Sequence, residues 1–172
     1  HLQNVYLLLG ETPPAELARP IKRKHQRANY ILPRSFLDVT VNGRRTFYEW
    51  LGAGRYQCQN ERGTMAMASQ GPLKELYFGF NARTLFVRVD FTRPARAALA
   101  DCDALRLGFE QPAGFSVLLR RPAEPGARAE LLREGTPGPG TQVEWGMEQI
   151  AELAVPFDRL GLKPDAPLQF YV

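Results

Sequence analysis

The side chains best suited to ligand chemistry are aromatic, and most of them lie in one stretch, residues 47–56 (FYEWLGAGRY). Flat aromatic rings stack on the apolar faces of pyranose rings, and planar polar side chains bond the surrounding hydroxyls. The second tryptophan of the chain lies in a predicted strand near residue 145. In a β-sandwich, tryptophans also fill the core, so both interpretations remain open. The candidate carbohydrate-binding residues are Tyr48, Trp50, Arg55, Tyr56 and Trp145.

Side chains arranged for catalysis are harder to find in this sequence than side chains suited to binding. Glycoside hydrolysis needs two carboxylates held across a cleft. Glu49, between two aromatic residues, is a candidate for an acid with a raised pKa, but a surface or ion-paired glutamate is the expected state. His1 and His25 both precede the predicted strands, so no histidine-based triad forms within them. We predict no catalytic residue, no cofactor and no activity for the isolated chain.

Metal binding is not predicted either. Asp101 and Asp103 flank Cys102, and two carboxylates are too few for a calcium site. Cys58 and Cys102 form no CxxC pair, and no histidine-rich tract accompanies them, so a structural zinc site is not expected. Both cysteines are expected to be buried thiols. The absence of disulfide pairing favours a cytoplasmic protein.

Length and charge limit the partners. The chain has 172 residues, 44% of them hydrophobic and 23% charged, as in a globular domain of ordinary size. The net charge is +4, and much of it lies in residues 22–27 (KRKHQR), which are expected to form a solvated linker. Nucleic acid is therefore not a predicted partner. No apolar run approaches the roughly 18 residues that a membrane span needs, so no membrane contact is predicted.

The elements that must position these side chains fall into two parts. Leu2, Val5, Tyr6 and Leu9 have helical spacing, and Gly10 follows at the position of a C-cap. We therefore predict that residues 1–29 are the tail of an upstream helical region followed by a basic linker. Residues 30–172 have the period of two that β-strands show, and we assign them to one accessory domain.

The expected fold is all-β, an antiparallel β-sandwich of jelly-roll type preceded by a short helix. In residues 85–91 the apolar side chains alternate with Arg88 and Asp90, which predicts one face on a core and one in water. A single helical turn is expected over residues 156–161. The predicted strands are 36–41, 76–80, 85–91, 104–109, 115–120, 128–133, 141–146, 150–155 and 168–172.

Several segments together resemble a known family. Residues 1–21 (HLQNVYLLLGETPPAELARPI) resemble the end of the helical region in family-57 glycoside hydrolases of the α-amylase and α-mannosidase type. Residues 42–54, with an NG turn followed by EWLGAG, resemble the start of the β-sandwich appended to those enzymes. Residues 73–80 and 84–90 resemble the paired strands that follow. Residues 152–162 (ELAVPFDRLGL) are similar to a closing signature of glucodextranase C-terminal domains and family-9 carbohydrate-binding modules.

The resemblance implies a DOMON-like β-sandwich that belongs to an α-glycan hydrolase or glycosyl-transferring enzyme. The two catalytic carboxylates of such an enzyme would lie in a (β/α) barrel upstream of His1, so none is carried over to this chain. Family-9 modules hold sugar between two tryptophans, and Trp50 and Trp145 are the only candidates here. The implied partners are an α-glucan or related polysaccharide and the upstream catalytic domain in cis.

Three functions follow from these observations. The leading one is a glycan-binding or substrate-positioning module, and the second is a structural domain that packs on the catalytic barrel and buries Trp50 in that interface. A haem-binding electron carrier would need axial histidine or methionine ligands from the sandwich. Only Met65, Met67 and Met147 are available for that role, so it is the least favoured.

Overall fold

The structure, a computed structural model, describes residues 2–14, 30–58, 71–162 and 166–172. The predicted linker run at 22–27 lies outside these ranges, as do His1, His25, Met65 and Met67. Helix α1 (Leu2–Leu8) forms where its apolar spacing predicts it. Gly10 follows the helix with a positive φ of 73°, which lets the N–H of Glu11 bond back to the carbonyl of Tyr6.

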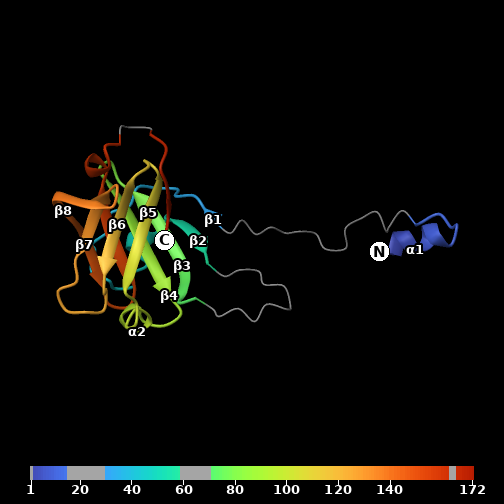
Figure 1. The fold of residues 1–172 in the computed structure, drawn as a ribbon, viewed down its shortest axis with the longest axis horizontal. Helices are drawn as coiled ribbons and strands as arrows, with labels where there is room; N and C mark the ends of the chain where they lie inside the picture. Colours follow the sequence, from blue (N-terminus) through green and yellow to red (C-terminus); the bar gives the residue numbers. More distant parts are fainter. Residues whose placement is uncertain (1, 15–29, 59–70, 163–165) are drawn as a thin grey trace.

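The described part of chain 30–172 is built almost entirely of strands (Figure 1). The strands are β1 (Tyr30–Ile31), β2 (Gly54–Gln57), β3 (Leu73–Phe80), β4 (Thr84–Phe91), β5 (Ala104–Gln111), β6 (Phe115–Arg120), β7 (Ala129–Arg133), β8 (Thr136–Met147), β9 (Ala151–Pro156) and β10 (Gln169–Tyr171). The helical turns are η2 (Tyr48–Trp50), α2 (Ala95–Ala98) and η3 (Phe157–Leu160).

The strands form one curled antiparallel sheet with the order β1-β2-β3-β4-β9-β8-β7-β6-β5-β10. The long strand β8 pairs with β9 through Glu144–Met147 and with β7 through its earlier residues, so it passes from one layer to the other. The two layers face each other across the core (Figure 1). The prediction of an all-β, antiparallel fold is therefore confirmed.

The main core lies between the layers and takes alternate residues of each strand. On β4 it takes Leu85, Val87 and Val89, all of them buried. On β9 their cross-strand partners at positions 155, 153 and 151 face the same way. This is the alternation that the sequence of β4 predicts.

The other face of β4 corrects one prediction. Arg88 and Asp90 were expected in water, but they are 6% and 5% exposed. The physical reason is that residues 33–53, which we call the covering segment, lie over this outer face. Leu37 and Trp50 of the covering segment form a second apolar cluster with Phe86. The sheet therefore has side chains buried on both faces.

The covering segment also explains a strand that is absent. Residues 36–41 were predicted as a strand, but they are extended chain outside the sheet. Both edges of β3 are already paired, with β2 and with β4, so β3 offers this segment no free edge. The N–H of Leu37 instead bonds the carbonyl of Phe80 at 3.0 Å. The predicted strands from 76–80 onward and the turn at 156–161 match the structure within a few residues. Strands β1 and β2, the turn η2 and helix α2 were not predicted.

Candidate carbohydrate-binding surface and the network beneath it

Trp50, the central aromatic of the candidate set, is 6% exposed and is held by a buried carboxylate. Its indole Nε1 donates to Oε1 of Glu152 at 3.0 Å. Glu152, on β9, is 1% exposed, and its Oε2 accepts the backbone N–H groups of Asn42 (3.1 Å) and Gly43 (2.9 Å). Three N–H donors of the covering segment therefore converge on one carboxylate. Because its ring is enclosed, Trp50 presents no face on which a sugar could stack.

A buried ion pair lies beside this carboxylate on the same face of the sheet. The guanidinium of Arg88 donates to both carboxylate oxygens of Asp90, at 2.6 and 3.0 Å, and to the carbonyl of Thr46 at 3.2 Å. It also lies 4.7 Å from the ring centroid of Tyr77 and 5.9 Å from that of Trp50. Such bidentate pairs combine charge with fixed geometry.

These groups hold the covering segment on the sheet. In the described ranges, every buried side-chain nitrogen and oxygen has a hydrogen-bond partner. The network therefore offers no spare polar atom to a ligand. What it supplies is rigidity, because a fully bonded polar cluster in a low-dielectric interior fixes the position of the chain that crosses it.

Glu49, the candidate acid, lies among groups that favour its ionised form. Its carboxylate accepts hydrogen bonds from the hydroxyl of Thr46 and from the backbone N–H of Thr40, the latter at 3.2 Å. The hydrogen bond from Thr46 is the main cause that holds the pKa of Glu49 below its ordinary value of 4.5. A general acid needs a raised pKa, so the shift has the opposite sign to the one that catalysis requires.

The neighbouring aromatic side chains on η2 point into solvent. Phe47 is 72% exposed and Tyr48 is 85% exposed, and their rings meet edge to face with centroids 5.6 Å apart. On β2, Arg55 pairs with position 77 and Tyr56 with position 76. Because successive residues of a strand alternate, Arg55 and Tyr56 point to opposite faces of the sheet. Arg55 is half-buried and Tyr56 is exposed.

The two tryptophans lie on opposite sides of one layer. Trp145 pairs with Leu153 and is half-buried against the main core. Trp50 packs in the outer cluster that includes Ala154, the next residue of β9. The sheet separates the two indoles, so they form no clamp around one sugar. Leu153 and Ala154 are successive residues of β9, so they face opposite sides of the sheet. The sequence alone did not place Trp50 beside Ala154, and so it did not show this separation.

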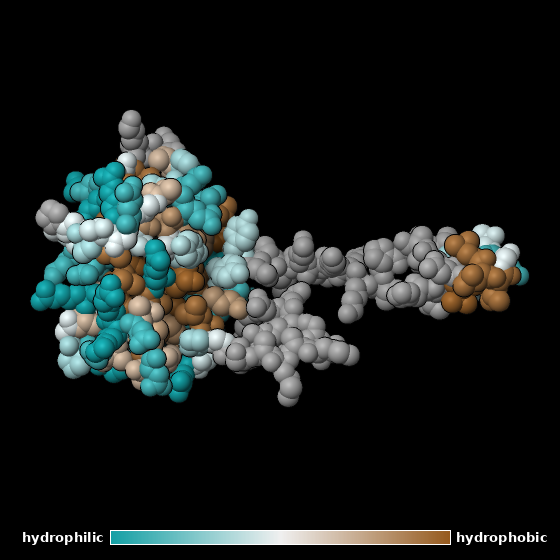
Figure 2. All heavy atoms as spheres, in the orientation of Figure 1, coloured by the Kyte–Doolittle hydropathy of each residue, from teal (hydrophilic) through white to brown (hydrophobic). Residues whose placement is uncertain are grey.

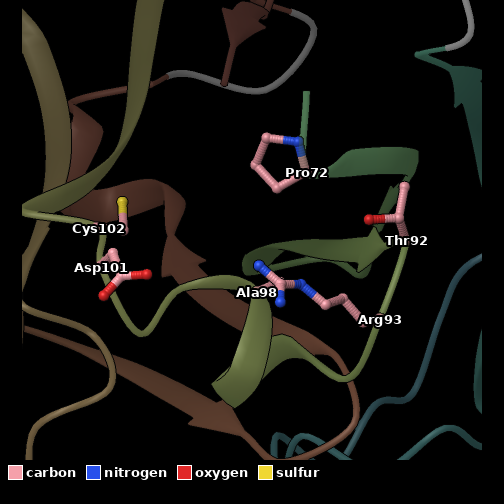
Figure 3. A pocket seen from close by; sticks show the side chains of 6 residues that line it. All are labelled: Pro72, Thr92, Arg93, Ala98, Asp101 and Cys102. Atoms are coloured by element: carbon pink, nitrogen blue, oxygen red, sulfur yellow. The ribbon is translucent and has the colours of Figure 1, made fainter. Parts of the chain in front are cut away.

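Two hollows lie on the surface of the described chain, and neither is lined by a residue of 47–56. One, of about 480 Å³, is lined by Pro72, Thr92, Arg93, Ala98, Asp101 and Cys102. Figure 3 shows Arg93 reaching under Pro72 while Asp101 lies on the opposite side. Asp103 lines a different hollow, of about 500 Å³, with Arg120, Arg121 and Glu124. The two aspartates suggested for calcium thus line separate hollows.

The cysteines, the methionine of the sandwich and the helices were each the subject of a prediction. Cys58 and Cys102 are free thiols, each half-buried. Met147 packs against the main core. Across the residues that the structure places, no group of three or more metal-ligating side chains gathers. Neither described helix has the length and apolar content to cross a membrane.

Comparison of the chain with protein-family models, with curated proteins and with solved structures found no match in any of the three.

Proposed function

We propose that this protein is a non-catalytic, carbohydrate-binding-type accessory domain of an α-glycan-processing glycoside hydrolase, and that Tyr48, with Phe47 beside it, is its sugar-stacking surface. The observation that carries the proposal is the pairing of exposure with rigidity at η2. Tyr48 is 85% exposed, while Trp50, two residues later, is fixed to Glu152. An exposed ring on a turn that is already fixed needs less ordering of the backbone when a pyranose stacks on it.

The proposal moves the site away from both tryptophans. Trp50 supports the surface from below, and Trp145 packs half-buried against the main core. Of the remaining candidates, Arg55 and Tyr56 flank the covering segment on β2 and keep accessible surface. The proposed ligand class is an α-glucan or related polysaccharide. This choice rests on the resemblance to family-57 enzymes alone.

Two observations support a non-catalytic role. The pKa of Glu49 is lowered rather than raised, so it does not suit proton donation. The buried carboxylates Asp90 and Glu152 are occupied by Arg88 and by N–H donors of the covering segment. The upstream catalytic domain in cis and a cytoplasmic location remain parts of the proposal that rest on sequence alone.

Affinity electrophoresis tests the proposal. The chain is run in native gels cast with soluble starch, glycogen or mannan, and we expect retardation in at least one of them. Tyr48→Ala should abolish the retardation. Tyr171→Leu, which removes an exposed aromatic ring from β10, is the control and should bind as the parent chain does. No retardation in any gel would overturn the binding role, and sugar release above a buffer blank would overturn the non-catalytic one.

Interdomain packing is the second candidate, and the apolar surface of α1 favours it. Val5, Leu7, Leu8 and Leu9 are all exposed, and Figure 2 shows this helix as a largely hydrophobic surface. Helices of that kind usually have a partner. A chain that binds no polysaccharide, but sediments as a concentration-dependent oligomer that Leu8→Glu disperses, would support this function instead.

A further inference from the structure

Three phenylalanine side chains from separate elements meet at one end of the sandwich. Phe36 belongs to the covering segment, Phe80 is the last residue of β3 and Phe157 is the first residue of η3. The ring centroid of Phe80 lies 5.8 Å from that of Phe36 and 6.4 Å from that of Phe157. In Figure 1, η3 lies at the end of the sandwich opposite to α2. We call these three residues the phenylalanine patch.

The phenylalanine patch is open to solvent. Phe36 is 73% exposed and Phe80 is 41% exposed, while Phe157 is half-buried against the main core. Single apolar side chains at a protein surface are ordinary, but a group of aromatic rings that the fold brings together there indicates a place of contact. The exposed rings of η2 form a separate pair, since Phe47 and Tyr48 meet each other.

Backbone contacts fix the elements that carry the three rings. The N–H of Leu37 donates to the carbonyl of Phe80 at 3.0 Å, which ties the covering segment to the end of β3. The N–H of Phe157 donates to the carbonyl of Arg83 at 2.8 Å, which ties η3 to the turn between β3 and β4. Leu37 also packs so closely on Gly79 that a Cβ there would collide with its side chain. A surface whose backbone is already fixed needs little ordering when a ligand binds.

Polar side chains border the phenylalanine patch. Asn81 and Arg83 lie in the turn between β3 and β4, and Asp158 follows Phe157 on η3. Arg83 and Asp158 are exposed. The Oδ1 of Asn81 accepts the N–H groups of Arg83 and Thr84, both at 2.9 Å, which holds its amide beside the rings. Such groups suit a sugar, because they bond its hydroxyls at the rim while an aromatic ring covers its apolar face.

The size of the phenylalanine patch favours a sugar over a protein as its ligand. With a phenylalanine surface of roughly 200 Å², the exposed fractions of Phe36 and Phe80 amount to roughly 200–250 Å² of open ring surface. A stable protein interface covers about 800 Å² on each partner. The patch is therefore too small for the apolar centre of such an interface, whereas a short stretch of pyranose rings covers an area of this order.

The angles between the rings bear on the shape of the glycan. The ring planes of Phe36 and Phe80 are inclined by 70°, and those of Phe80 and Phe157 by 60°. A cellulose-type β-glucan is a flat ribbon, so it stacks best on rings that lie in one plane. An amylose-type α-glucan turns from each glucose to the next and presents successive sugar faces at an angle. The inclined rings therefore match the curved chain.

We propose that the phenylalanine patch is a second sugar-binding surface and that it takes the curved chain of an amylose-type α-glucan. A pyranose stacks on Phe36, the most exposed of the three rings, while Arg83 and Asp158 bond its hydroxyls. This inference rests on the proposed sugar-binding function, but it uses no residue of η2. A surface this small binds with a Kd on the order of 1 mM, so by itself it does not retard the chain in a gel.

NMR titration of the isotope-labelled full chain tests the proposal. Maltoheptaose should shift the amide signals of Leu37 and Asn81, and it should do so equally in Tyr48→Ala. Cellohexaose at the same concentration should shift them several-fold less, because its chain is flat. Phe36→Leu keeps an apolar side chain at an exposed position and removes the ring, so it should abolish these shifts. Phe36→Trp keeps a stacking ring and should retain them.

The outcomes separate this proposal from the proposed function. Shifts confined to the amides of η2, or shifts at Leu37 and Asn81 that Phe36→Leu leaves intact, would overturn the second surface and leave the first. Shifts at Leu37 and Asn81 alone, lost in Phe36→Leu, would support the second surface while the first fails. Equal shifts with the two oligosaccharides would overturn the match to a curved chain. No shift with either sugar would overturn both surfaces, and self-association that Phe36→Ala disperses would then identify a protein contact instead.

Discussion

The indole Nε1 of Trp50 donates a hydrogen bond to the Glu152 carboxylate at 3.0 Å, although the two residues are 102 positions apart in the chain. This bond joins the covering segment to the central strand β9. The same carboxylate accepts the backbone N–H groups of Asn42 and Gly43, so one side chain holds the covering segment at two places. A buried charge bonded in this way stabilises the fold only while all its partners remain.

Glu152→Gln should therefore destabilise the domain, although it keeps the size of the side chain. The amide has one acceptor oxygen, and its NH₂ group must face either the indole N–H of Trp50 or the backbone donors. We expect the free energy of unfolding to fall by about 2–3 kcal/mol, measured by urea denaturation. Glu144→Gln is the matched control, because Glu144 is exposed on β8; its effect should stay within about 0.5 kcal/mol. Equal effects of the two changes would show that the buried carboxylate is not a structural centre.

Gly146→Ala should separate the covering segment from the sheet. A Cβ on Gly146 would lie 2.8 Å from the carbonyl carbon of Asn42 and 2.8 Å from the nitrogen of Gly43, both backbone atoms. The backbone must shift, so we expect a loss of about 1–3 kcal/mol and faster hydrogen exchange at the Gly43 amide. Gly71→Ala, with no atom within 4 Å of the new Cβ, should be neutral or stabilising. Unchanged exchange at Gly43 in Gly146→Ala would contradict this close contact.

The sequence was sufficient for the strands from β3 onward because period-two alternation and turn residues are local signals. The segment Thr84–Phe91 shows this, since its inward residues Leu85, Val87 and Val89 are all buried. The outer face of β4 could not be predicted in the same way. Arg88 and Asp90 resemble solvent-facing residues until the covering segment, some 40 positions earlier in the chain, is placed over them.

The candidate site was harder to predict for the same reason. Residue type made Trp50 the foremost sugar ligand, but its burial depends on Glu152, which is distant in sequence. Tyr48, two residues earlier, has the same local composition around it and is exposed. Which of two neighbouring aromatics is buried depends on tertiary contacts of η2, and no periodic signal in residues 47–56 encodes it. The pairing of a buried tryptophan with a buried carboxylate is thus a finding of the structure.

Cys58 should react slowly with alkylating reagents. Burial is the main cause that raises the pKa of its thiol above 9.0, and the negative charge of Glu75 adds to it. Because the thiolate is the nucleophile, its reaction with iodoacetamide in a Cys102→Ser background should reach half its maximal rate above pH 9.0. Glu75→Gln should lower that midpoint in part, since burial remains. Mass spectrometry of the alkylated peptide measures both profiles, and a midpoint below that of a free thiol would contradict the prediction.

The hydrogen bond from Thr46 to Glu49 should make part of the stability depend on pH. The bond lowers the pKa of Glu49 in the folded state below its ordinary value of 4.5, so the unfolded chain binds the proton more readily. The stabilisation is then fully present above the unfolded-state pKa and is lost as pH falls through the folded-state pKa. Thr46→Val removes the hydroxyl, so the variant should be less stable at neutral pH and the difference should shrink in acid.

Urea denaturation of the parent chain and Thr46→Val, from about pH 7 to about pH 3, measures this difference. Thr92→Val makes the same chemical change at an exposed residue that directly follows β4. Its effect on stability should not vary with pH. The exposed part of Glu49 is screened by solvent, which keeps the effect small. Its sign is still decisive: a gap between parent and Thr46→Val that stays constant, or widens, as the pH falls would show that Glu49 is not the linked group.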